Sequence, residues 1–118
     1  MRKLINSFSN AMRGIAILFK TQINARIELS ITFIVVIAGI LFRINTSEWL
    51  AILLCIALVL GLEGINTSIE IILDKLHPGF DTKIGKAKDV AAGAVLIAAI
   101  VAAIIGFTIF APRLMDLI

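Results

Sequence analysis

The chain has 118 residues, of which 60% are hydrophobic, and it carries a formal net charge of +3. A soluble domain of this size could not bury so much apolar side chain, because small domains leave a large share of their surface exposed. The composition therefore excludes a soluble globular protein and predicts an integral membrane protein. It also argues against nucleic-acid binding, because no basic stripe with interleaved aromatic residues is present. The single Cys55 has no partner for a disulfide and is interpreted as a small apolar residue.

Residues 1–20 predict an amphipathic helix. Hydrophobic side chains recur there at helical spacing, and basic and amide side chains occupy the positions between them. This pattern is typical of a helix that lies in the headgroup region of a membrane. A cleaved signal peptide is not expected, since no uninterrupted apolar segment precedes a small-residue cleavage site. The apolar positions are Leu4, Phe8, Met12, Ile15 and Phe19.

Three uncharged segments follow, Leu29–Phe42, Leu50–Leu62 and Val90–Ala111. They predict three membrane-spanning helices, at about 26–44, 49–74 and 82–111. Trp49 is expected to act as an interfacial anchor for the second of them. Between the last two lies a charged loop and helix start, residues 75–89, in which Asp81 is placed to cap the third span. The fold class that follows is an all-α integral membrane protein, with residues 1–118 forming one membrane domain.

The distribution of basic residues predicts the orientation. Lys and Arg are concentrated before the first span and in the 75–89 segment, whereas the turn after the first span and the C-terminus carry one each. The N-terminus and the 75–89 segment are therefore expected in the cytoplasm and the C-terminus outside. Small residues recur every four positions in the last span, which favours close helix packing and self-association. They are Ala94, Ala98, Ala102 and Gly106.

The second span ends in an unusual row of polar residues, which we call the acidic row: Glu63, Asn66, Glu70 and Asp74. At about 100° per residue, the three acidic residues fall within roughly 40° of one another and Asn66 lies about 60° to one side. All four share one helix face. A carboxylate at mid-bilayer costs roughly 2.5–3.5 kcal/mol, and less near the interface, so something on this face must compensate.

Three interpretations of this acidic row remain open from the residues alone. The polar side chains could join helices by hydrogen bonds, form a proton or ion pathway, or hold a divalent cation such as Mg²⁺ through carboxylate and amide oxygens. Lys86, Lys88 and Asp89 stand at the cytoplasmic end of the third span, near Glu70 and Asp74. Carboxylates beside lysines favour the metal interpretation, because together they suit a metal-bound polyphosphate.

The segments "EGINTSIEIILD" (63–74) and "GKAKDVAAGAVLIAA" (85–99) resemble the motifs of the prokaryotic diacylglycerol kinases. These are small three-span membrane enzymes that include the undecaprenol kinases. "SFSNAMRG" (7–14) and "NARIEL" (24–29) are similar to the N-terminal elements of the family. The resemblance implies a homotrimeric helical bundle, with MgATP as phosphoryl donor and a membrane lipid alcohol as acceptor.

The resemblance also implies roles for individual residues. Glu63 corresponds to the catalytic base that takes the proton of the lipid hydroxyl, and Glu70 to a metal-binding carboxylate. Asn66, Lys88 and Asp89 correspond to residues that organise ATP and the catalytic face, with contributions from neighbouring subunits.

One departure from the family pattern concerns the metal. Gln22 stands where the family usually has a glutamate that helps to hold the metal, and a neutral carbonyl oxygen coordinates more weakly. Glu28 adds a carboxylate nearby, but six residues along a helix is roughly 240° away, so it is not expected to replace that glutamate directly.

The leading hypothesis is an ATP-dependent lipid kinase of the bacterial inner membrane, acting at the cytoplasmic interface. The competing hypothesis is a non-enzymatic assembly subunit or a component of a proton-coupled transporter. The segments "INTSIE" and "KDVAAGAV" are closer to the undecaprenol kinases than to the enterobacterial type, but the sequence leaves the choice between undecaprenol and diacylglycerol open.

Overall fold

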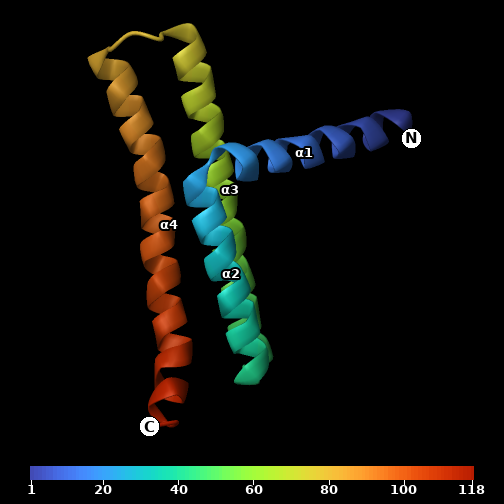
Figure 1. The fold of residues 1–118 in the computed structure, drawn as a ribbon, viewed down its shortest axis with the longest axis vertical. Coiled ribbons are helices and arrows are strands. Elements are labelled where there is room, and N and C mark those ends of the chain that lie inside the picture. Colours follow the sequence, from blue (N-terminus) through green and yellow to red (C-terminus); the bar gives the residue numbers. More distant parts are fainter.

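The computed structural model describes residues 1–118 and contains four helices and no strands. They are α1 (Arg2–Thr21), α2 (Ile23–Leu41), α3 (Thr46–Leu76) and α4 (Thr82–Met115). The last three are each long and apolar enough to cross a membrane. They run beside one another, whereas α1 extends sideways from the bundle (Figure 1). The predicted all-α membrane fold, with one amphipathic helix and three spans, is confirmed.

The helix boundaries differ from the predicted ones in a way that matters for the site. The first span begins at Ile23 instead of residue 26, because only Gln22 separates α1 from α2. It ends at Leu41, and Arg43 then adopts a positive φ of 52° that turns the chain. At 1.5 Å per residue, α3 and α4 are about 47 and 51 Å long, which exceeds the roughly 30 Å hydrocarbon thickness. Both helices must therefore extend well beyond the bilayer core.

The end of the bundle formed by residues 42–45 and the C-terminus of α4, called here the turn end, is held together by polar contacts. The side chain of Asn45 accepts a hydrogen bond from the backbone of Glu48 at 2.9 Å, and the Glu48 carboxylate accepts one from the backbone of Asn45 at 3.0 Å. This capping box begins α3. Arg113 of α4 donates to both carboxylate oxygens of Glu48, at 2.7 and 2.8 Å. The start of α3 is therefore tied to the end of α4.

The apolar core also lies at the turn end. Ile44, Ile52 and Ile109 are its buried centre. Trp49, expected as an interfacial anchor, packs into this core against Gly39 of α2. Phe42 and Phe110 meet with ring centroids 6.2 Å apart. The side chains around the centre are Val35, Phe42, Trp49, Ile56, Ile105 and Phe110.

The opposite end, called here the loop end, is formed by residues 77–81 between α3 and α4 (Figure 1). Asp81 accepts hydrogen bonds from the backbone of Ile84 at 3.1 Å and of Lys83 at 2.9 Å, which confirms the predicted cap. These bonds, helped by the nearby His77, lower the pKa of the Asp81 carboxyl below its usual range. α4 thus starts at a fixed point just beyond the acidic row.

Candidate functional site

The polar face of α3 is buried where α1 and α2 join the bundle. Glu63 is only 3% exposed and Asn66 is 8% exposed, although neither faces a basic side chain. The last turn of α1 lies against this part of α3, since a Cβ added to Gly64 would stand 3.7 Å from Leu18. The junction of the surface helix with the first span therefore covers the start of the acidic row.

Asn66 and Glu70 interact with each other and leave an oxygen free. The amide nitrogen of Asn66 donates to the Glu70 carboxylate at 3.3 Å, as their spacing of four residues allows. The amide oxygen of Asn66 is buried and has no hydrogen-bond partner. Buried polar atoms are nearly always paired, so this oxygen is suited to a bound cation or donor.

Glu28 of α2 is a site residue that sequence reasoning did not place. Its carboxyl group lies beside that of Glu63, close enough for the two to interact directly across the α2–α3 contact. One of its oxygens, Oε2, is buried without a hydrogen-bond partner. Two acceptor groups thus face each other with no donor between them. A hydroxyl, a proton or a cation placed there would satisfy both.

Lys88 reaches the acidic row from α4, at the loop end. Its ammonium group forms an ion pair with Asp74, and both side chains are partly open to solvent. This contact brings Lys88 of the "AKD" segment to the last member of the row, as the sequence indicated. Asp89 is exposed and makes no hydrogen bond or ion pair, because one further residue turns it to another side of α4. Within one chain, Asp89 does not join the group.

Gln22 occupies the single-residue break between α1 and α2, and its amide nitrogen donates to Thr21 at 3.4 Å. It makes no hydrogen bond to Glu70. The chain also assembles no group of three or more His, Cys, Asp or Glu side chains arranged to hold a metal. The structure instead provides oxygen atoms on α3 that are suited to bind a hard metal ion, and the amide oxygen of Asn66 among them has no hydrogen-bond partner.

The arrangement combines a carboxylate pair at the helix junction, in which Glu63 is buried and Glu28 is half-buried, with a carboxylate–lysine pair beyond it. From Glu63 to Asp74 the helix rises by about 17 Å, so the two pairs lie in different surroundings. Such a site can remove a proton near lipid and bind charged groups near water.

Comparison with known proteins shows the family of the chain. Residues 9–110 match the family described as prokaryotic diacylglycerol kinase. The chain is 38% identical to the undecaprenol kinase of Bacillus subtilis, over 97% of this chain and 93% of that protein. It is 36% identical to a diacylglycerol kinase of Synechocystis, over 97% of this chain and 66% of that protein. The chain therefore belongs to the prokaryotic diacylglycerol kinase family, a family of membrane lipid kinases.

Proposed function

We propose that this protein transfers the γ-phosphoryl group of MgATP to the hydroxyl of a membrane lipid alcohol, undecaprenol or diacylglycerol. The observation that carries the proposal is the burial of Glu63 without a cationic partner. An unpaired buried carboxylate is costly, and a structural role would normally supply a basic partner. The cost is understandable if the carboxylate is kept free for a substrate proton.

In this proposal Glu63 is the general base. The lipid hydroxyl donates its proton to the Glu63 carboxylate while its oxygen forms a bond to the γ-phosphorus. The bond from that phosphorus to the bridging oxygen breaks, and ADP leaves. A base held at hydrogen-bonding distance contributes on the order of 10²–10⁴-fold to such a step.

The remaining residues position the nucleotide and neutralise its charge. Glu70 and the unpartnered amide oxygen of Asn66 are hard oxygen ligands of the kind that Mg²⁺ prefers, and Gln22 would add a weaker one. The bound ion would withdraw charge from the phosphoryl oxygens. Lys88 exchanges its ion pair with Asp74 for a contact with phosphate oxygens. Asp89 organises the nucleotide from the exposed side of α4, away from Lys88.

The proposed location follows from the two substrates. MgATP cannot enter hydrocarbon, and the hydroxyl of a lipid alcohol stays near the headgroups. The amphipathic α1 would lie in that layer, and it meets α3 at Gly64, the residue after Glu63. The basic residues of the N-terminal segment and the loop end favour the cytoplasmic face of the bacterial inner membrane. Asp89 is exposed in the single chain. In a homotrimer, a neighbouring subunit would complete the part of the site around it.

The test is phosphoryl transfer by the purified protein in lipid vesicles, with γ-labelled ATP and with undecaprenol and diacylglycerol offered separately. We expect label in at least one lipid and a loss of roughly 10²–10⁴-fold in kcat for Glu63→Gln. Asp116→Asn is the matched control, because this exposed acid lies at the turn end, far from the site. Helix content and elution volume check that each variant folds.

The proposal fails if neither lipid acquires label. It also fails if Glu63→Gln retains the rate of the Asp116→Asn control.

A further inference from the structure

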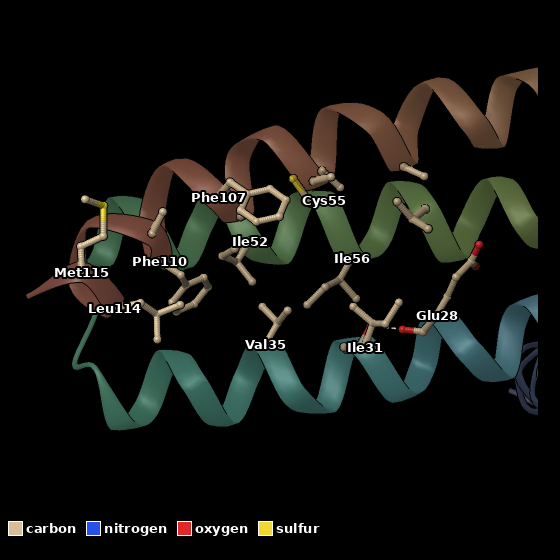
Figure 2. A pocket seen from close by; sticks show the side chains of 17 residues that line it. Glu28, Ile31, Val35, Ile52, Cys55, Ile56, Phe107, Phe110, Leu114 and Met115 are labelled. Atoms are coloured by element: carbon tan, nitrogen blue, oxygen red, sulfur yellow. Dashed lines mark hydrogen bonds between the residues drawn. The ribbon is translucent and has the colours of Figure 1, made fainter. Parts of the chain in front are cut away.

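The surface helix α1 makes little contact with the rest of the chain. Residues 2–17 are all exposed, and only Leu18 and Phe19 in its last turn are half-buried. Figure 2 shows the apolar groove of the bundle, which is lined by residues of α2, α3 and α4 and by none of α1. Helices in proteins owe most of their stability to the packing of an apolar face. The apolar face of α1 therefore needs a partner outside this chain.

Three of the four basic residues of α1 form a row, called here the cationic row. At about 100° per residue, Arg2, Arg13 and Lys20 fall within roughly 20° of one another. The row lies about 130° from the middle of the apolar face, so it borders that face. Lys3 borders the other edge, and α1 contains no acidic residue. At 1.5 Å per residue, the cationic row is about 27 Å long.

The cationic row has no anionic partner within the chain. None of its members forms an ion pair, and Arg13 only donates to the side chain of Asn10 at 3.5 Å. Lys and Arg side chains beside an apolar face lay their stems along hydrocarbon and carry their charge outward. A partner that suits α1 must therefore offer an apolar layer and, above it, negative charge along the whole row.

We infer that the apolar face and the cationic row together bind the anionic phospholipid headgroups of a membrane leaflet, which hold α1 beside the candidate site. The inference goes beyond the proposed function, because it assigns a ligand to residues that take no part in phosphoryl transfer. α1 points sideways from the spans, as a helix lying along a membrane surface does (Figure 1). A basic segment near such a surface is attracted by anionic lipids.

The chain itself holds α1 only at one end. Leu18 lies against Gly64, the residue after the proposed base. Gln22 alone separates α1 from α2, its backbone is extended, and its side chain caps neither helix. The remaining length of α1 is therefore left for the lipid surface to hold.

A second copy of this chain is a poorer partner for the cationic row. Of the eight acidic residues, six are already engaged, three at the candidate site and three in contacts within the chain. Asp89 and Asp116 remain, and they stand about 40 Å apart, near opposite ends of α4. No second copy can therefore present carboxylates along the row. The six engaged residues are Glu28, Glu63, Glu70, Glu48, Asp74 and Asp81.

The test measures amide hydrogen exchange of the full chain in nanodiscs of phosphatidylcholine, with and without an equal part of phosphatidylglycerol. Docking protects the backbone of α1, so exchange of residues 4–17 reports it. A cation near an anionic surface contributes roughly fivefold, so the cationic row should slow exchange on the order of 100-fold when phosphatidylglycerol is present. Raising the salt to about 1 M, which screens charges beyond about 3 Å, should abolish the slowing.

A matched pair of variants tests the cationic row itself. Arg2→Gln/Arg13→Gln removes two of its members and should reduce the slowing at least about tenfold. Both arginines lie before the turn that contacts Gly64, so that contact is left in place. Lys75→Gln/Lys83→Gln is the control, because it removes the same charge from exposed positions at the loop end. It should keep the full slowing, and circular dichroism checks the helix content of both variants.

Equal exchange rates in the two membranes would overturn the inference, because a lipid-held α1 must respond to headgroup charge. Slow exchange in both would assign the apolar face to a protein partner such as a second copy. Slowing that persists in high salt, or that Arg2→Gln/Arg13→Gln shares with its control, would also overturn it. A higher KM for ATP in that variant, with unchanged exchange, would assign the arginines to the nucleotide instead.

The exchange measurement contains neither ATP nor a lipid alcohol, so it separates this inference from the proposed function. Charge-dependent protection of α1 in a protein that phosphorylates no lipid would support the lipid surface and refute the kinase proposal. Phosphoryl transfer with no charge-dependent protection would overturn the lipid surface alone.

Discussion

The close contact between Gly39 and Trp49 predicts that Gly39→Ala destabilises the protein. The indole ring of Trp49, which belongs to α3, packs against α2 at the position of this glycine. A Cβ at residue 39 would stand 2.7 and 2.9 Å from two ring carbons of Trp49 and 3.1 Å from Ile44. Carbon atoms in contact normally stand about 3.5–4.0 Å apart. The missing space is therefore close to 1 Å on the side of the indole.

The magnitude follows from how little the surroundings can yield. The indole is a rigid ring, and it belongs to the core of the turn end together with Ile44 and Ile52. Overpacking of this kind costs about 1–3 kcal/mol in the free energy of unfolding. Alanine also favours a helix over glycine by roughly 0.5–1 kcal/mol, which offsets part of that cost. A net loss of about 1–2 kcal/mol is expected.

Gly61→Ala is the matched control for this prediction. Gly61 also lies within a spanning helix, but a Cβ there meets nothing within 4 Å, so only the helix preference remains. Unfolding in mixed micelles of increasing sodium dodecyl sulfate, followed by circular dichroism, gives the stability of each variant. Trp49 is the only tryptophan, so a change in its emission at native conditions reports its displacement directly.

The reasoning is refuted if Gly39→Ala is as stable as Gly61→Ala and its tryptophan emission matches that of the wild type. That result would mean that the helices do not approach each other at Gly39.

Three further changes test other parts of the structure. Asn45→Ala removes the cap of α3 and should lower the free energy of unfolding by about 1 kcal/mol in the same titration, whereas an unchanged midpoint would contradict the capping box. The Asp81 pKa is lowered on folding, so its contribution is present above its unfolded pKa and is lost as pH falls through the lower folded value. Asp81→Asn keeps a cap without titrating, so its deficit relative to the wild type should shrink below about pH 4 and not at pH 6–8. Gln22→Glu should lower the Mg²⁺ concentration needed for half-maximal phosphoryl transfer, and an identical Mg²⁺ titration would remove Gln22 from the metal site.

The features that the sequence predicted well are local ones. The spans follow from uncharged segments, and the cap at Asp81 follows from its place after Pro78 and Gly79. The acidic row follows from helical spacing. The same spacing of four residues accounts for the hydrogen bond between Asn66 and Glu70. The capping box of Asn45 and Glu48 was also within reach, because the sequence "NTSE" is its usual signature.

The features that sequence reasoning missed depend on how two helices are rotated relative to each other. Glu48 and Arg113 are 65 residues apart, and nothing in either segment specifies that they meet. The same holds for Glu28, whose carboxyl lies beside Glu63 only because α2 starts at Ile23 and presents that face to α3. The apolar groove between α2, α3 and α4 is likewise formed only when these three helices pack together. Periodicity gives the faces of a helix, but only packing decides which faces meet.

The proposed roles also explain why α3 is longer than a bilayer requires. Glu63 and Glu70 carry the same functional group, and about 10 Å of helix separates them. The first is 3% exposed at the helix junction, whereas the row beyond it ends in the solvent-accessible pair of Asp74 and Lys88. A carboxylate poised to take a lipid proton must stay free of cations, and a carboxylate that holds a metal must meet water-soluble ions. In the proposed arrangement, one helix that crosses the boundary between lipid and water would supply both environments. Depth along α3, more than residue type, would then separate the base from the metal ligand.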